Sequence, residues 1–149
     1  MKKVVIGSDH AGFDVKERIK KELGDQYEFV DVGPDNDEAS DYPIYGEKVA
    51  QQVAVTPDVQ GVVVCGSGIG ISIAANKVPG IRAALCYSKE AAQSARQHND
   101  ANVISIAGRT KMMDDPATIV KTFLETDFSH VDRHERRVKQ MMDIERHSR

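Results

Sequence analysis

A glycine-rich segment that follows a cysteine carries the most chemical information in this sequence. Residues 61–65 form the apolar run Gly-Val-Val-Val-Cys, and Gly66, Gly68 and Gly70 follow before a stretch with helical character. Closely spaced glycines leave backbone N–H groups unobstructed, and the amino end of a helix carries partial positive charge. The same positive end would favour a thiolate at Cys65. We therefore predict a site for an anion or a developing oxyanion, with a reactive thiol at its mouth.

The spacing of these residues does not match the common phosphate-binding loops. Ile71 stands where the dinucleotide-binding pattern requires a third glycine and where a thiol phosphatase requires an arginine. Cys65 stands where a phospho-receiver domain carries an aspartate, and a Walker loop would need Gly-Lys-Ser/Thr. An ordinary strand-to-helix turn with a buried, inert cysteine remains the alternative interpretation. Cys86 lacks comparable surroundings, so we expect it to be structural.

Polar residues also follow other predicted strands. Asp9 and His10 follow the first strand, where they could cap a helix or handle a sugar hydroxyl and a phosphate; the residues alone do not decide between these roles. Gly108 and Arg109 follow the fifth strand. In a parallel sheet the carboxyl ends of the strands share one edge. We therefore expect these residues and the Cys65 loop to lie on one rim.

Two further groups of residues could contribute to a site. His98 and Asn99 end a predicted helix, with Asn99 as its C-cap, and could alternatively face a ligand across a subunit contact. Arg133 and Arg137 are one turn apart on one helix face and together could bind one phosphate, whereas Arg136 points elsewhere. A solvated basic helix is an equally good interpretation of that segment.

Strands and helices alternate along the chain and would position these residues. The expected strands are residues 4–7, 27–32, 61–65, 81–86 and 102–107. The expected helices are residues 11–23, 43–55, 68–77, 88–98, 116–126 and 133–145. This alternation predicts a three-layer α/β fold: a doubly wound, Rossmann-like parallel sheet of five strands, with helices on both faces and an additional C-terminal helix.

Length, charge and cysteine content narrow the class of protein. The chain of 149 residues fits one domain, residues 1–149, and its net charge of −3 argues against a nucleic-acid partner. No apolar stretch has membrane-spanning length, and the first strand is too short for a signal peptide. Two cysteines form no disulfide framework and have no metal-type spacing. We expect a cytoplasmic protein without a membrane partner.

Five motifs occur in one order along nearly the whole chain. They are Gly-Ser-Asp-His-Ala-Gly-Phe at 7–13, Asp-Tyr-Pro at 41–43, Val-Cys-Gly-Ser-Gly-Ile-Gly-Ile-Ser-Ile-Ala-Ala-Asn-Lys at 64–77, Arg-Gln-His-Asn-Asp at 96–100 and Arg-His-x-x-Arg at 133–137. This set resembles the B-type ribose-5-phosphate isomerases, in the family that also contains galactose-6-phosphate isomerase subunits. The resemblance implies interconversion of ribose 5-phosphate and ribulose 5-phosphate without a metal or other cofactor. It also implies a homodimer or a dimer of dimers, with sites shared between subunits.

The resemblance also implies a role for each site residue. Cys65 would be the base that moves a proton between C2 and C1 through a cis-enediolate, and His98 would open the furanose ring. Asp9 and Ser67 would assist near the ring oxygen and the hydroxyls. The backbone cradle for the enediolate would consist of Gly66, Ser67, Gly68, Ile69 and Gly70. Tyr42 and Asn99 would line the sugar pocket, and the phosphate ligands would be His10, Arg109, Arg133 and Arg137.

The chain departs from the family pattern at two places. Ser67 stands where many members carry Thr and keeps the hydroxyl, and residues 129–132 replace a usual Gly-Gly, so the backbone before Arg133 should differ. Two other functions remain open at this point. One is isomerisation of a six-carbon phosphate such as allose 6-phosphate or galactose 6-phosphate, and the other is a non-catalytic module that binds a phosphosugar or nucleotide.

Overall fold

The computed structural model describes residues 1–147, and its strands form one parallel sheet. The strands are β1 (Lys2–Ser8), β2 (Tyr27–Asp31), β3 (Gln60–Cys65), β4 (Ala83–Leu85) and β5 (Val103–Ala107), in the order β2-β1-β3-β5-β4. The helices are α1 (Phe13–Leu23), α2 (Tyr42–Val55), α3 (Ile69–Asn76), α4 (Lys89–Asn99), α5 (Pro116–Glu125) and α6 (Asp132–His147). A 3-10 turn, His10–Gly12, precedes α1. The predicted doubly wound α/β fold is confirmed.

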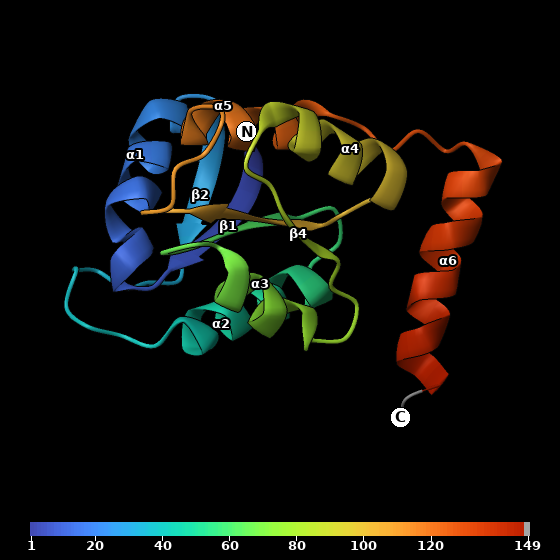
Figure 1. Ribbon diagram of the computed structural model, residues 1–149, viewed down its shortest axis with the longest axis horizontal. Helices are drawn as coiled ribbons and strands as arrows, with labels where there is room; N and C mark the ends of the chain where they lie inside the picture. The colour runs from blue at the N-terminus through green and yellow to red at the C-terminus, as the bar shows by residue number, and fades with distance from the viewer. Residues whose placement is uncertain (148–149) are drawn as a thin grey trace.

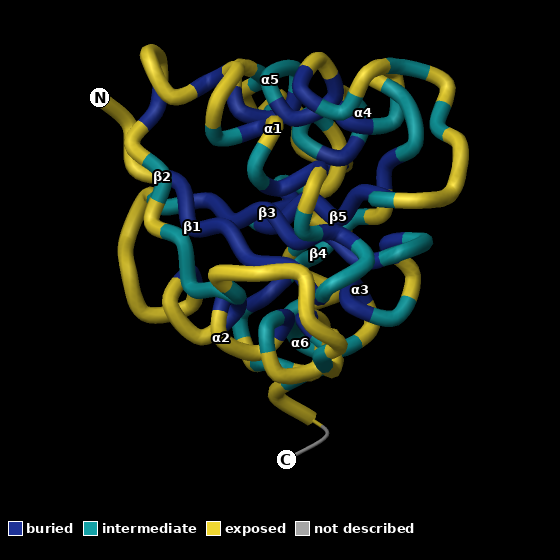
Figure 2. Tube along the Cα trace, turned by 90° about the vertical axis from the view of Figure 1, so that its left-hand side faces the viewer, coloured by how far each residue is buried: buried dark blue, intermediate teal, exposed yellow. Residues whose placement is uncertain are grey.

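The sheet lies between two layers of helices. Figure 1 shows α1, α4 and α5 on one face and α2 and α3 on the other. Val62 and Val64 of β3 pack into the core on the first face, and Val63 and Cys65 pack into the core on the second. All of β3 is buried because both faces are covered, as Figure 2 shows for the centre of the sheet.

The order of the strands places the switch point of the fold between β1 and β3. From β1 the chain runs outward to β2, and from β3 it runs to the opposite side of the sheet. Loops that leave the two central strands therefore diverge at the carboxyl edge, which is where doubly wound proteins bind ligands. Asp9 follows β1 and the glycine loop follows β3, so both lie at this switch point.

The edge strand β4 is shorter than predicted. The apolar run 81–86 suggested six residues, but the ladder with β5 covers Ala83–Leu85. Before this ladder, the Arg82 N–H donates to the Asn102 side chain at 2.8 Å, while Arg82 O accepts the N–H groups of Asn102 and Val103. The helix predicted from residue 11 begins at Phe13, since the preceding residues form the 3-10 turn.

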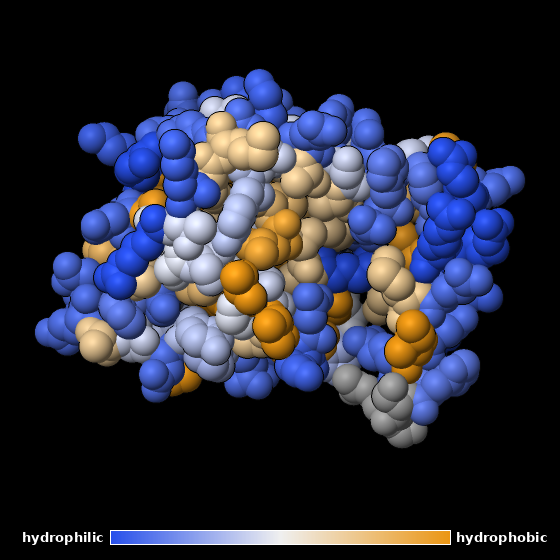
Figure 3. Space-filling view, in the orientation of Figure 1, coloured by the Kyte–Doolittle hydropathy of each residue, from blue (hydrophilic) through white to orange (hydrophobic). Residues whose placement is uncertain are grey.

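The last helix, α6, stands apart from the two helical layers. In Figure 1 it lies beside the sheet, beyond β4 and the end of α4, and Figure 3 shows a hollow between it and the body. This hollow has a volume of about 790 Å³. Apolar side chains line it from both sides, with Ile81 on the body and Met141 and Ile144 on α6.

Candidate active site

Cys65 and the glycine loop form the centre of the candidate site. Cys65 ends β3 with 4% of its surface exposed, and its Sγ accepts a hydrogen bond from the Gly68 N–H at 3.2 Å. Gly68 has φ +77°, a left-handed conformation that favours glycine. The turn at Gly68 thereby brings a backbone donor back against the thiol that precedes it.

Three contacts hold the loop carbonyls on one side. Gly66 O accepts the Arg109 N–H at 2.9 Å, Ser67 O accepts the Tyr87 hydroxyl at 2.6 Å, and Gly68 O accepts the Ser105 hydroxyl at 2.6 Å. In a trans peptide the N–H points opposite to the C=O. The amides of residues 67, 68 and 69 therefore point away from these partners. The Gly68 N–H points at Cys65 Sγ and the Ile69 N–H donates to the Ser67 hydroxyl at 3.1 Å, so the loop directs N–H donors toward the side that holds the thiol and this hydroxyl.

Asp9 lies beside this loop and also caps a helical turn. Its N–H donates to Val64 O at 3.2 Å, and its buried carboxylate accepts the Gly12 N–H at 3.0 Å. The helix-capping interpretation is therefore correct for Asp9. It fixes the carboxylate next to the last residues of β3.

His10 and Tyr42 are placed by the segment between β2 and α2. The His10 N–H donates to the Ser40 hydroxyl, and its Nδ1 lies 3.1 Å from both the backbone N and O of Ser40. Tyr42 begins α2, and its ring lies over Gly70 so closely that a Cβ there would come within 2.6 Å of ring carbons. The carboxyl edge therefore brings together Asp9, His10, Tyr42, Cys65–Gly70 and Arg109.

His98 and Asn99 lie at the opposite edge of the sheet. α4 runs back from the carboxyl end of β4 to the amino end of β5, and Asn102 just beyond it accepts the N–H of Gly61 at the start of β3. Cys65 is at the other end of β3, four residues beyond Gly61 and roughly 13 Å from it at about 3.3 Å per residue. One chain therefore does not bring His98 and Cys65 together.

The end of α4 differs from the prediction in one detail. Asn99 is the last helical residue, and Asp100 is the C-cap, with φ +46° and its N–H donating to Ala95 O and Arg96 O. The prediction that Asn99 is the C-cap is wrong. Asp also tolerates the left-handed conformation, and the Arg96 guanidinium binds the Asp100 carboxylate at 2.9 Å.

The arginines of α6 belong to the group at the amino edge. The His98 and His134 rings lie 4.6 Å apart between centroids, so the first turn of α6 contacts the end of α4. Arg133 and Arg137 flank His134 on α6 and are exposed. The resemblance predicted an altered backbone at residues 129–132. There, His130 adopts φ +57°, and the Ser129 hydroxyl binds the Val131 N–H and His134 Nδ1.

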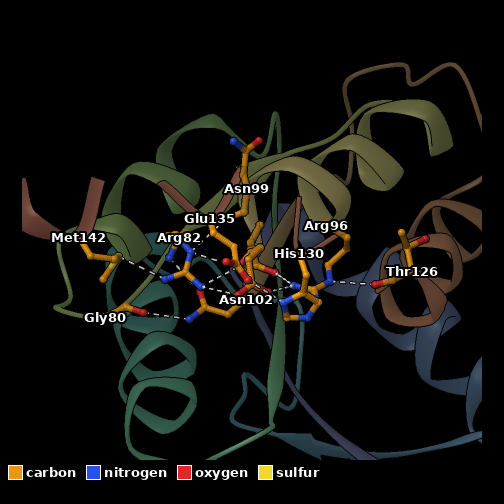
Figure 4. A network of polar contacts seen from close by, with 11 residues as sticks. Gly80, Arg82, Arg96, Asn99, Asn102, Thr126, His130, Glu135 and Met142 are labelled. Atoms are coloured by element: carbon orange, nitrogen blue, oxygen red, sulfur yellow. Dashed lines mark hydrogen bonds and ion pairs between the residues drawn. The ribbon is translucent and has the colours of Figure 1, made fainter. Parts of the chain in front are cut away.

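Figure 4 shows the polar contacts of Arg82 with the end of α4 and with α6. The Arg82 guanidinium donates to Asn99 O and Asp100 O and reaches Met142 Sδ of α6 at 3.2 Å. Burial lowers the pKa of Arg82, and the Asp100 carboxylate opposes that shift. Arg82 remains a cation because the shift starts from the high pKa of arginine.

The pKa values of His134 and Cys86 are both shifted, mainly by burial. Burial, and then the charges of Arg133, His98 and Arg137, lower the pKa of His134 below its usual value. Burial raises the pKa of the Cys86 thiol to about 12, which makes it inert near neutral pH and agrees with a structural role.

Within residues 1–147 no cluster of three His, Cys, Asp or Glu side chains could hold a metal ion. None of the helices described is both long and apolar enough to cross a membrane.

A family model described as Ribose/Galactose Isomerase matches residues 4–141. The chain belongs to this family. Among curated relatives, ribose-5-phosphate isomerase B of Mycolicibacterium paratuberculosis is 42% identical over 146 residues, which cover 97% of this chain and 92% of the relative.

Solved structures of the Ribose/Galactose Isomerase family are similar over almost the full chain. Ribose-5-phosphate isomerase B of Clostridium thermocellum has a TM-score of 0.93 and 44% identity, with 99% of each chain covered. The corresponding protein of Mycoplasma genitalium, with bound ribulose-5-phosphate, has a TM-score of 0.90 and 37% identity, with 97% of this chain and 96% of that chain covered.

Sequence reasoning missed several residues that hold the candidate site in place. Ser105 was detectable in principle, because it is the single hydroxyl in the buried strand Val-Ile-Ser-Ile-Ala. Tyr87 and Ser40 gave no comparable signal, because their partners, Ser67 and His10, lie 20 and 30 residues away in the sequence. Arg82 likewise gave none, since a charged residue beside an edge strand is usually solvated.

Proposed function

We propose that the protein interconverts ribose 5-phosphate and ribulose 5-phosphate, with Cys65 as the base and the glycine loop as the oxyanion site. The observation that carries this proposal is the hydrogen bond from the Gly68 N–H to Cys65 Sγ inside a loop whose carbonyls are held on the far side. Family membership and the ribulose-5-phosphate bound to the Mycoplasma genitalium relative support the choice of substrate.

The reaction needs a base, an acid and stabilisation of an oxyanion. The Cys65 thiolate takes the proton from C2 of the open-chain aldose, and the carbonyl oxygen on C1 becomes the oxyanion of a cis-enediolate. The backbone N–H groups of Gly66 to Gly70 stabilise that charge; removing a single such donor elsewhere costs about 10²–10³ in rate. The thiol then returns its proton to C1 while the O2 hydroxyl proton passes to O1, which gives the ketose.

The remaining groups bind and open the sugar. His98 acts as the acid–base group that opens the furanose ring, and Asp9 and Ser67 hold the ring oxygen and hydroxyls. Asn99 and Tyr42 line the sugar pocket. The phosphate is bound by His10, Arg109, Arg133 and Arg137, and binding energy at this distant group holds the reacting carbons against Cys65.

The site requires two chains, because Cys65 and His98 lie at opposite edges of one sheet. A second copy related by a two-fold axis would place His98, Asn99 and the α6 arginines of each chain against the Cys65 loop of the other. Apolar residues beside the Cys65 loop support this arrangement: Ile69 and Ile73 of α3 are about half exposed, at 49% and 55%. Figure 3 shows hydrophobic side chains over this region and on α6 across the hollow.

The decisive experiment compares three substrates in one assay. Turnover of ribose 5-phosphate, allose 6-phosphate and galactose 6-phosphate is measured with chelator present and no added metal. Fast conversion of the pentose phosphate alone is the expected result. A preference for either hexose phosphate would leave the proposed mechanism in place but change the proposed substrate. No turnover of any of the three would contradict an isomerase and favour a non-catalytic binding module.

A further inference from the structure

Contacts near its two ends hold α6 against the body. At its start, the Ser129 N–H donates to Gln97 O at 3.2 Å and the His134 ring packs on His98. At its end, Glu145 accepts the Gly80 N–H. The hollow of about 790 Å³ lies against the C-terminal part of α6, where Met141, Met142, Ile144 and Glu145 line it. The direction of α6 therefore depends on contacts near its two ends.

The contact at the far end is made on a rigid part of the body. Both carboxylate oxygens of Glu145 lie within hydrogen-bond distance of the Gly80 N–H, at 2.9 and 3.1 Å. Gly80 is itself held by Asn102, whose side-chain amide donates to Gly80 O at 2.9 Å. The same Asn102 side chain accepts the Arg82 N–H. A charged acceptor that binds an N–H on a fixed turn makes a strong, directional hydrogen bond.

Arg82 connects the same part of α6 to the end of α4. Its Nη2 donates to Asp100 O at 2.7 Å, and its Nε lies 3.1 Å from both Asn99 O and Asp100 O. Its Nη1 lies 3.2 Å from Met142 Sδ (Figure 4). One half-buried guanidinium thus fixes the backbone of Asn99 and touches the helix that carries Arg133 and Arg137.

We propose that Arg82 and Glu145 are positioning residues that hold Arg133 and Arg137 at the distance from His98 and Asn99 that the sugar phosphate requires. Helical rise places Glu145 about 16 Å beyond His134 and Arg137 about 4.5 Å beyond it. If α6 turns about the His98–His134 contact, Arg137 moves by roughly a quarter of the displacement at Glu145. Misplacement by about 1 Å at a substrate-positioning group costs up to about 100-fold.

This inference rests on the proposed role of Arg133 and Arg137 in phosphate binding, so the test separates phosphate binding from turnover. Glu145→Ala is compared with Asp143→Asn, which removes the same charge from the same helix at a side chain paired with Arg146. The measurements are the Kd for inorganic phosphate by calorimetry, KM and kcat for ribose 5-phosphate, and the mass of the assembly by sedimentation.

For Glu145→Ala we expect KM and the phosphate Kd to rise roughly 5- to 20-fold while kcat changes less than twofold. Glu145→Gln should lie between this variant and the wild type, because an amide oxygen still accepts the Gly80 N–H. Arg82→Lys should raise KM and also lower kcat, because it releases Asn99 as well as α6. Asp143→Asn should match the wild type.

Three outcomes would overturn the inference. They are wild-type KM and phosphate Kd in Glu145→Ala, an equal loss in Asp143→Asn, or a loss of affinity that occurs only with dissociation of the assembly. Failure of the proposed function has a different signature. The wild type would then convert no ribose 5-phosphate, while the comparison of phosphate Kd values would still test the positions of the α6 arginines.

Discussion

The amide of Gly68 donates to the sulfur of Cys65 at 3.2 Å, so a backbone dipole points at the atom proposed to take the substrate proton. Ser105 supports this contact from behind, because its hydroxyl holds Gly68 O at 2.6 Å. The base and its neighbouring donor are consequently parts of one rigid turn between β3 and α3. A rigid arrangement of this kind needs no reorganisation when negative charge develops.

The two cysteines of the chain provide a matched pair for testing the base. Cys65→Ala should lower kcat by about 10³-fold, in line with the contribution of a positioned base, and leave the circular dichroism spectrum unchanged. Cys86→Ala should stay within twofold of the wild type, because burial raises the pKa of the Cys86 thiol to about 12 and keeps it protonated at neutral pH. Turnover retained by Cys65→Ala would remove the thiol as the base.

Neighbouring arginines on α6 allow a similar comparison for the phosphate. Arg137→Gln should raise KM for ribose 5-phosphate by about 10-fold or more, as expected for loss of a charge-assisted pair, with a smaller effect on kcat. Arg136→Gln removes the same charge one position earlier, on another face of the helix, and should change KM less than twofold. Steady-state kinetics at fixed ionic strength make the comparison, and equal effects of the two variants would reject a specific phosphate contact.

The separation of Cys65 from His98 predicts complementation between inactive chains. Purified Cys65→Ala and His98→Asn proteins should each be nearly inactive. After unfolding and refolding together, half of the dimers are mixed, and each mixed dimer has one site with both wild-type groups. Activity should therefore return to roughly a quarter of the wild-type value. No recovery, in a mixture shown by mass spectrometry to contain mixed dimers, would place both groups in one chain's site.

His134 should report occupation of the phosphate site. Burial first, and then Arg133, His98 and Arg137, lower its pKa. Bound phosphate offsets the two arginine charges, so the pKa of His134 should rise toward the ordinary histidine value when inorganic phosphate is added. Arg137→Gln should raise this pKa without phosphate. NMR titration of the imidazole resonances tests both, and a pKa insensitive to phosphate would contradict phosphate binding beside His134.

Lys16 and Lys20 should differ strongly in their contribution to stability. Lys16 is fully buried, and its Nζ donates to both Asp31 carboxylate oxygens at 2.9 Å and to Pro34 O. Lys16→Met leaves the half-buried Asp31 short of a partner and should lower the free energy of unfolding by about 3 kcal/mol. Lys20→Met, at a partly exposed partner of the same carboxylate, should cost less than about 1 kcal/mol in urea titrations at pH 7.

The ion pair between Lys16 and Asp31 should make the free energy of unfolding depend on pH. Burial tends to raise the pKa of Asp31, but hydrogen bonds from Lys20, Lys16 and the Gly33 N–H outweigh it, so the pKa is lowered overall. The corresponding stability is present above the ordinary carboxyl pKa and is lost as the pH falls through the lowered value. The Lys16→Met penalty should therefore shrink between pH 5 and pH 2. A penalty that does not vary with pH would show that packing, and not charge, accounts for it.

The sequence was most informative where local chemistry and topology coincide. The convergence of Asp9, Cys65 and Arg109 could be predicted, because parallel strands bring their carboxyl ends to one edge. The same argument applied to the helix before β5 would have placed His98 at the other edge. The contacts of Arg82 with α6 could not be predicted, because side chains far apart in sequence make them. The cap at Asp100, too, depends on the packing of Arg96.

Two glycines of the loop constrain how the sequence can change over evolutionary time. At Gly70 a Cβ would collide with the Tyr42 ring at 2.6 Å, so a larger residue becomes possible only after Tyr42 is replaced by a smaller one. At Gly68 the obstacle is the Ile106 backbone oxygen at 2.8 Å, together with the positive φ, so a change of a neighbouring side chain does not remove it. Position 70 should therefore covary with position 42 among homologues, whereas position 68 should stay glycine in every lineage that keeps this loop.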